Sequence, residues 1–311
     1  MNKIERVRAA LAGETPDRVP ASFWFHFPEE QAHGKAAVQA HLEYYHQADL
    51  DFLKIMNEHP YHVKMEIKNP ADWRKLKPAP QSSAFYQAQL DEIKMITDAL
   101  GGECLTTTTI FNPFSSGNHC SGKQVTEHLK MDPDSVQIGL GTIAESLAEF
   151  ALACLDAGSD GIYFSAQGGE ADRFEEDVFL NYIKPHDLTV LNAVKDQGEL
   201  NILHICRDNI RLHLYSNYPG NVVNWAATAQ NNIPLSAGKR LFDRTILGGM
   251  DNRGVIVEGN QEAIEARVQA ILAEFGEQNL ILGADCTLPT EIDIERIRTA
   301  VEATSTFEPG R

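Results

Sequence analysis

Three residues in the sequence have the side chains and the spacing to bind a metal ion: His204, Cys206 and Cys286. His204 and Cys206 are two residues apart in a stretch typical of a strand, so their side chains are expected on the same side of it. One imidazole and two thiolates suit Zn²⁺, and three protein ligands leave a fourth position open for a substrate. The alternative is that the two cysteines are ordinary core residues, because free cysteine is often buried.

Short apolar runs rich in β-branched residues alternate with helical patterns from residue 51 onward, which is typical of βα units around a parallel sheet. We expect strands over 51–56, 103–110, 161–166, 200–206, 221–226, 244–249 and 279–284, with a further candidate at 20–26. These units predict an α/β fold, a (β/α)8 TIM barrel preceded by an N-terminal helical extension. In such a barrel the residues that follow the strands meet at one mouth, and Cys286 would therefore join His204 and Cys206 there.

The intervening segments carry helix signals. Apolar residues recur at helical spacing over 143–157 and 261–275, each followed by a glycine, and Thr290 and Asp293 have the spacing of a capping box for a helix over 291–303. The stretch 111–122 lacks a regular pattern and is expected to be a mobile loop over the barrel mouth. No repeat or long linker is apparent, so the prediction is one domain spanning residues 1–311.

Composition excludes several classes of protein. The chain has 43% hydrophobic and 23% charged residues, typical of a globular protein, and its 44 acidic against 27 basic residues give a net charge of −17. This charge argues against nucleic-acid binding and against polyanionic substrates. The sequence has no signal-peptide pattern and no run of about 18 apolar residues, which predicts a cytoplasmic protein that does not enter a membrane. Five cysteines are a poor disulfide framework.

Several stretches resemble the uroporphyrinogen decarboxylase superfamily. They are RVRAALAGETPDRVPAS at 6–22, FEEDVFLNYIKPHDLTVLNAVK at 174–195 and GGMDNRG at 248–254. Decarboxylases of the superfamily carry an Arg-containing segment after the first strand-like stretch, but residues 23–30 here read FWFHFPEE, without arginine. The branch of zinc-dependent methyltransferases instead has His-x-Cys and a distant Cys as zinc ligands, which His204, Cys206 and Cys286 match.

The resemblance implies a function. Zinc would favour the thiolate of a substrate thiol, and that thiolate would take a methyl group from a corrinoid, carried by a partner protein. Many relatives have a further Glu ligand near the fifth strand, but residues 221–231 lack a carboxylate. Asp251 and Asp285 follow strands and are candidates for catalysis at the zinc site, either as a further ligand or as acids that orient the ligands.

Asn57, His59, Gln167 and Glu170 also follow strands and are therefore expected near the mouth. The candidates for substrate binding are Trp24, His26, Asn57, His59, Gln167 and Glu170, with solvated loops as the alternative and packing in the barrel for Trp24. We expect Cys120 to be a loop thiol, and Cys104 and Cys154 to be structural.

Two other functions remain open from sequence. One is a divergent porphyrinogen decarboxylase that uses a strand-end aspartate, which the missing arginine segment opposes. The other is a barrel that binds a corrinoid or porphyrin without reacting, which the missing Glu favours. The sequence leaves the methyl donor and acceptor and the oligomeric state undetermined.

Overall fold

A seven-stranded parallel sheet forms the centre of the computed structural model, which describes residues 1–63 and 65–307. The strands are β1 (Phe52–Ile55), β2 (Leu105–Phe111), β3 (Ile162–Ala166), β4 (Ile202–Ile205), β5 (Val222–Trp225), β6 (Thr245–Met250) and β7 (Leu280–Ala284). They pair in sequence order, each with the next. All seven strands lie within one or two residues of the predicted ranges at each end. The α/β barrel prediction is confirmed.

The extended segment 20–25 lies between the two edges of this sheet. Ala21 and Phe25 form isolated parallel bridges with Leu282 and Leu288. On the other side, the Asp51 N–H donates to the Ala21 carbonyl at 3.0 Å, and the Ser22 hydroxyl donates to the Phe52 carbonyl at 2.9 Å. The segment thus takes the place of the predicted strand at 20–26, although only these single bridges have regular strand pairing.

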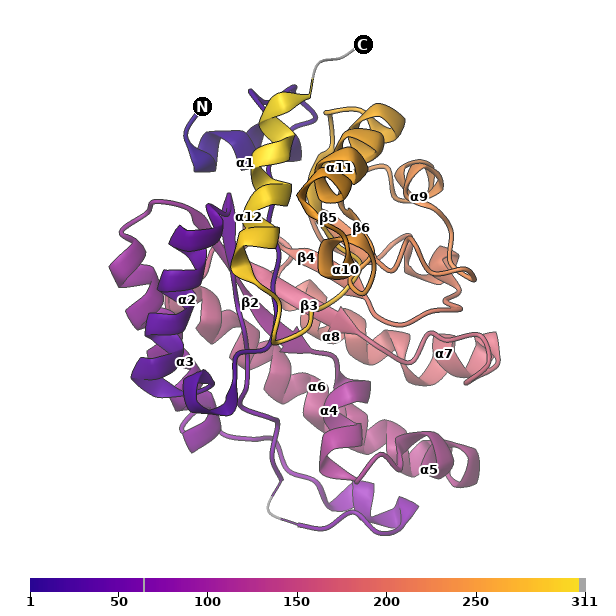
Figure 1. Cartoon of the computed structure of the whole chain (residues 1–311). Helices are drawn as coiled ribbons and strands as arrows, with labels where there is room; N and C mark the ends of the chain where they lie inside the picture. Colours follow the sequence, from indigo (N-terminus) through magenta and orange to yellow (C-terminus); the bar gives the residue numbers. More distant parts are fainter. Residues whose placement is uncertain (64, 308–311) are drawn as a thin grey trace.

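Helices surround the sheet (Figure 1). They are α1 (Lys3–Leu11), α2 (Gly34–Ala48), α3 (Ala84–Leu100), α4 (Pro113–Cys120), α5 (Val125–Met131), α6 (Pro133–Asp156), α7 (Glu176–Tyr182), α8 (Lys184–Val194), α9 (Leu235–Phe242), α10 (Val255–Glu258), α11 (Gln261–Phe275) and α12 (Ile294–Ala303). Helix α1 is the predicted N-terminal extension. It lies at one end of the molecule in Figure 1, and α4 and α5 lie at the opposite end.

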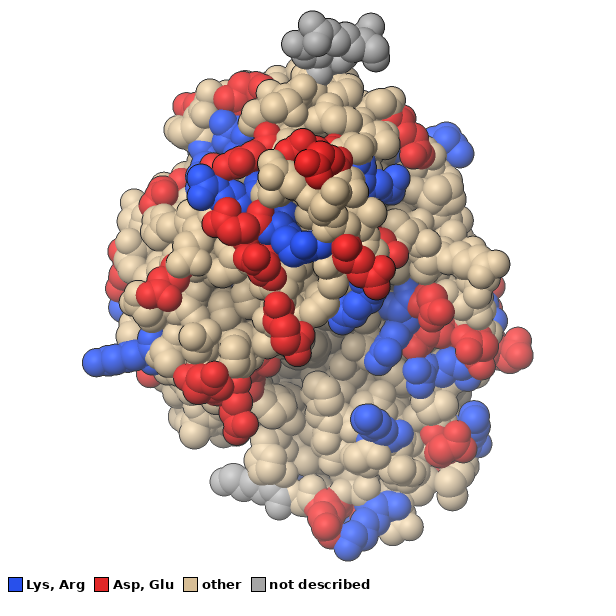
Figure 2. All heavy atoms as spheres, in the orientation of Figure 1, with Lys and Arg blue, Asp and Glu red and all other residues tan. Residues whose placement is uncertain are grey.

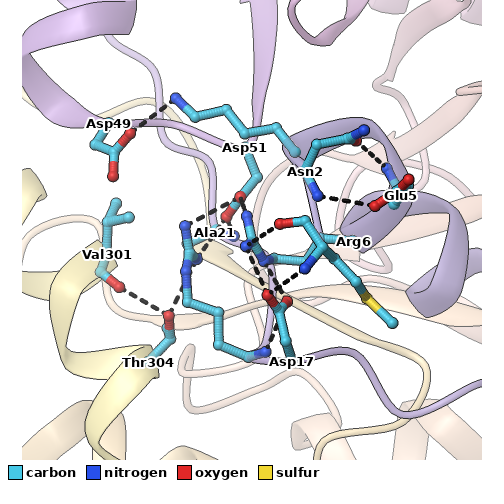
Figure 3. A network of polar contacts seen from close by, with 12 residues as sticks. Asn2, Glu5, Arg6, Asp17, Ala21, Asp49, Asp51, Val301 and Thr304 are labelled. Carbon is cyan, nitrogen blue, oxygen red and sulfur yellow. Dashed lines mark hydrogen bonds and ion pairs between the residues drawn. The ribbon is translucent and has the colours of Figure 1, made fainter.

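The residues around the Pro-Asp-Arg turn at 16–18 join α1 to the start of β1 (Figure 3). Asp51 is fully buried, and its carboxylate accepts hydrogen bonds from Arg6, Arg18 and the Ala21 N–H, each with a shortest distance of 2.7 Å. Arg6 also binds Asp17 at 2.7 Å. This network lies at the amino ends of the strands, the end of a barrel where residues usually serve stability.

Two helix predictions need correction. Residues 113–120 form helix α4 rather than a mobile loop, because the Asn112 side chain caps it by accepting from the Ser115 N–H, and Pro113 occupies its first turn. The last helix begins at Ile294, and Asp293 is itself the N-cap that accepts from the Glu295 N–H. Thr290 therefore does not form the predicted capping box.

Helix α6 is long and apolar enough, by length and composition alone, to cross a membrane, with a mean hydropathy of 1.5 over its best window. Half of that window is buried inside the structure. The buried residues of α6 include Ile143, Leu147 and Phe150, which belong to the hydrophobic core. Burial of this kind is typical of a core helix.

Acidic and basic side chains are intermingled on the face that Figure 2 shows, without a broad basic area there. This distribution agrees with the chain's net charge of −17. An intermingled surface with an acidic excess gives little attraction for a polyanion at long range.

Candidate metal centre

Strands β4 and β7, which are not adjacent in the sheet, bring the three predicted ligands together at the carboxyl ends of the strands. His204 lies within β4, and Cys206 follows that strand by one residue, where its N–H continues the ladder by donating to the Ala166 carbonyl at 2.9 Å. Cys286 lies two residues beyond β7, held by the Asp285 N–H, which donates to the Met250 carbonyl at 2.9 Å. Parallel strands therefore position all three residues at one mouth.

The donor atoms of His204, Cys206 and Cys286 all lie within 4.8 Å of one another. The Cys286 Sγ atom is 3.6 Å from His204 Nε2. His204 is 2% exposed, and the two cysteines are partly exposed. An N/S/S donor set that is buried on one side and reachable from solvent on the other fits a Zn²⁺ ion with an open position.

Asn224, on β5, orients the imidazole of His204. Its Oδ1 atom lies 2.5 Å from His204 Nδ1, and its Nδ2 atom donates to the carbonyls of Leu247 and Ala284 at 2.9 and 3.1 Å. Because Nδ2 is committed to two carbonyls, Oδ1 is the acceptor, and His204 Nδ1 must carry a proton. Nε2, the atom that faces Cys286, then keeps its lone pair for a metal.

The inside of the barrel next to His204 contains aromatic rings and one lysine. Tyr163 stacks on His204 with ring centroids 5.1 Å apart, and Trp24 contacts Tyr163 edge-on at 5.0 Å. The Lys54 Nζ atom lies 4.4 Å from the Tyr163 ring centre and donates to Met56 Sδ at 3.0 Å. Burial lowers the pKa of Lys54 to about 7. Trp24 is 2% exposed and lies inside the barrel rather than at an open surface.

The two thiols of the site titrate as a pair. The Cys286 pKa is lowered, mainly by a hydrogen bond with Cys206, and the Cys206 pKa is raised by the same contact and by burial. Cys286 is therefore the first of the two to become a thiolate. Both thiols can be ionised at the same time only when a nearby positive charge balances them. A divalent cation would supply that charge.

The two predicted aspartates differ in environment. Asp285 is buried, and its Oδ2 atom accepts hydrogen bonds from the Thr228 N–H and hydroxyl at 2.9 and 2.5 Å. Its Oδ1 atom is buried without a hydrogen-bond partner among residues 1–63 and 65–307. Burial raises the pKa of Asp285 to about 6. Asp251 is exposed, and its Oδ1 accepts from the Arg253 N–H at 2.9 Å.

Residues 57–59 follow β1 and are held in place by their own side chains. Asn57 donates through Nδ2 to the Thr109 carbonyl at 3.2 Å, and its Oδ1 accepts from the His59 N–H at 3.0 Å. His59 Nε2 lies 3.0 Å from the Glu92 carboxylate. His26 is exposed and pairs with Glu58 at 2.6 Å.

Gln167 and Glu170 follow β3. The Gln167 carbonyl accepts from Asn112, and Glu170 accepts from the Gly168 N–H at 3.0 Å and from Arg173 at 2.7 Å. Glu170 also lines a cleft of about 510 Å³ that reaches Arg207, the residue after Cys206. The lining residues are Thr126, Lys130, Glu170, Asp172, Arg173, Arg207 and Asp208. Residues that follow β3 and residues that follow β4 thus line the same cleft.

Sequence reasoning missed Asn224, Tyr163, Lys54 and Thr228. Lys54 and Asn224 could have been found, since each is a polar residue inside a short apolar run, DFLKIM and NVVNWA. A polar side chain in a strand that is buried on both faces needs a partner inside the barrel. Thr228 has no comparable signal, because its contact with Asp285 joins residues 57 positions apart.

The uroporphyrinogen decarboxylase family model matches residues 53–307. The chain belongs to this family. Among curated proteins it is similar to the methylcobamide:CoM methyltransferases MtbA of Methanosarcina mazei, at 22% identity, and Methanosarcina acetivorans, at 21%. Each match spans 217 residues, which are 70% of this chain and 63% of the relative.

Solved structures with a similar fold agree with the barrel. A methyltransferase from Methanosarcina mazei superposes with a TM-score of 0.76 at 16% identity, over 98% of both chains. A B12-independent methionine synthase from Shewanella sp. W3-18-1 follows with a TM-score of 0.63 at 14% identity, covering 93% of this chain and 96% of that one. At these identities the likeness concerns the fold.

Proposed function

We propose that this chain is a zinc-dependent methyltransferase that moves a methyl group between a corrinoid, carried by a partner protein, and a small thiol. The observation that carries the proposal is the convergence of His204, Cys206 and Cys286 within 4.8 Å at the barrel mouth. The similarity to two methylcobamide:CoM methyltransferases supports the same reaction class. Five free cysteines support a reducing, cytoplasmic location.

Zinc, when bound by these three residues, would supply the charge that favours the thiolate form of an incoming thiol. Other residues of the chain keep these three side chains in forms that can bind the ion. Asn224 fixes the His204 tautomer, and the Cys206–Cys286 pair releases its protons when a cation arrives. Burial of His204 against Tyr163 keeps water away from one side of the site.

We assign Asp285 as the acceptor for the thiol proton. Its Oδ1 atom is buried and lacks a partner within the described part of the chain, and it adjoins Cys286 in sequence. Thr228 holds the other oxygen in place. Asp251, exposed after β6, adds negative charge close enough to Asp285 to raise its pKa.

The substrate thiol would enter through the cleft beside Glu170 and Arg207. We propose that Gln167 and Glu170 border it on one side, and that His26, Asn57 and His59 border the mouth on the other. Trp24, inside the barrel, would contribute through Tyr163, which packs on both Trp24 and His204. The corrinoid is expected to reach this mouth on its carrier protein.

A double variant, Cys206→Ser with Cys286→Ser, tests the proposal. Co²⁺ replaces zinc as a coloured probe, and thiolate ligands give it a sulfur-to-cobalt charge-transfer band. We expect the wild-type chain to show this band and to transfer methyl groups from methylcobalamin to CoM, and the double variant to lose both. Cys120→Ser, which changes a half-buried thiol on α4, is the matched control and should keep both.

Methyl transfer at the wild-type rate in the double variant would refute the proposal. So would the absence of the charge-transfer band from the Co²⁺-loaded wild type. Turnover of uroporphyrinogen that persists in the double variant would favour decarboxylation instead.

A further inference from the structure

A second group of metal-binding side chains lies away from the cysteines. His33 is the N-cap residue of α2, His59 lies in the loop after β1, and Glu92 lies on α3. Their ligand atoms are within 4.8 Å of one another. These residues are far apart in the sequence, so only the fold brings them together.

Direct contacts hold this group in place. His59 Nε2 is 3.0 Å from Glu92 Oε1, and the rings of His33 and His59 are 4.8 Å apart, centre to centre. The Gly34 N–H donates to Glu92 Oε1 at 2.6 Å. The backbone of His59 is fixed by the bond from its N–H to Asn57, which in turn binds β2. The side chains of His59 and Glu92 are thus already held in positions from which they could bind an ion.

Among residues 1–63 and 65–307, no lysine or arginine balances the charge of Glu92. Glu92 is 4% exposed, and within residues 1–63 and 65–307 its only ion-pair partner is His59. Buried carboxylates normally have a cationic partner or coordinate a metal. His59 is a cation only when it is protonated. A divalent cation would balance the carboxylate and use the lone pairs of both imidazoles.

We propose that His33, His59 and Glu92 bind one divalent cation of the Zn²⁺, Co²⁺ or Ni²⁺ class, separate from the cysteine site. Two imidazoles and one carboxylate suit these ions, and the absence of sulfur distinguishes the site chemically from the first. The ion would link the start of α2, the loop after β1 and α3. It would therefore fix residues 57–59, which border the barrel mouth.

The test uses the full chain with Cys206→Ser and Cys286→Ser, so that the first site cannot bind. After treatment with a chelator, this variant is titrated with Co²⁺ and followed by calorimetry and visible absorption. We expect about one equivalent of Co²⁺ per chain, a spectrum without a sulfur charge-transfer band, and a higher melting temperature with the ion than without it.

Adding His33→Ala, an exposed position, should weaken Co²⁺ binding by at least about tenfold. Adding His59→Ala as well should abolish it. His46→Ala is the matched control, because His46 is also an exposed histidine, with Glu103 at 3.9 Å but no second histidine ligand identified beside it. It should leave the affinity unchanged.

The proposal is overturned if the double cysteine variant binds no stoichiometric Co²⁺, or if the two histidine replacements leave its affinity intact. Should the double cysteine variant fail to fold by circular dichroism, the wild-type chain is compared with its His33→Ala variant by metal analysis. A loss of about one zinc per chain supports the site, and an unchanged content overturns it. The charge-transfer band reports on the cysteine site alone, so failure of the proposed methyl transfer is seen separately.

Discussion

The two ends of the barrel differ in whether their buried polar groups have hydrogen-bond and ion-pair partners. At the amino ends of the strands, Asp51 is buried between Arg6 and Arg18, and both of its oxygens accept several hydrogen bonds (Figure 3). At the carboxyl ends, Cys206 and Cys286 are two adjacent thiols, and Asp285 has a buried oxygen without a partner in the described chain. Paired groups stabilise the fold, whereas unpaired groups can accept a ligand or a proton.

The largest effect is expected from Asp51→Asn at the amino end. This change leaves two arginines, each about one-tenth exposed, without their shared carboxylate. Loss of one member of a buried ion network costs about 3–5 kcal/mol of unfolding free energy. Urea unfolding measures it. Asp49→Asn is the control, because the exposed pair Lys3–Asp49 contributes less than about 1 kcal/mol. Equal unfolding free energies for the two variants would contradict the comparison.

A smaller and different effect is expected from Asn224→Ala at the carboxyl end. Without Asn224 the imidazole of His204 loses the acceptor for its Nδ1 proton. Loss of such a partner lowers metal affinity by about 10–100-fold. Competition with a coloured chelator for Zn²⁺ measures it, on protein shown to be folded.

The control for this variant is Asn201→Ala. Asn201 precedes β4 at the amino end and accepts from the Ile162 N–H at 3.0 Å. Its replacement should lower the urea midpoint without changing the affinity for Zn²⁺. If both asparagine variants weaken zinc binding equally, the division of roles between the two ends is wrong.

The last effect depends on pH and concerns Asp187, a fully buried carboxyl on α8 that binds Asn112 and Tyr218 rather than an arginine. Burial raises its pKa from 3.8 to about 8. A carboxyl with a raised pKa contributes most to stability below its unfolded pKa, and this contribution is lost as the pH rises towards 8.

Asp187→Asn resembles the protonated side chain at every pH. We therefore expect the variant to be more stable than wild type at pH 8 and above, with the difference shrinking as the pH falls and disappearing below pH 4. Urea unfolding at several pH values measures this. A constant difference across the range would show that the pKa of Asp187 is the same in the folded and unfolded states, and would contradict the raised value.

The strands and the grouping of His204, Cys206 and Cys286 at one mouth could be predicted from short sequence patterns. Buried parallel strands are short apolar runs, and His-x-Cys at the end of one puts both side chains on the same face. Helix α4 was also within reach, since Asn112-Pro113 is a helix start signal, but polar residues in 111–122 suggested a loop. The partner of His204 was not predictable, because Asn224 is on a different strand.

The sequence by itself determined the order of the elements and the barrel, since side-chain periodicity and strand ends are local properties. It also predicted that His204, Cys206 and Cys286 lie together, as the structure shows. Only the tertiary structure decided which groups meet. Asn224 reaches His204 across β4 and β5, Thr228 reaches Asp285, and His33 and His59 meet Glu92 from three separate elements. Such contacts depend on the register and curvature of the sheet, which bring together residues that no spacing in the chain connects.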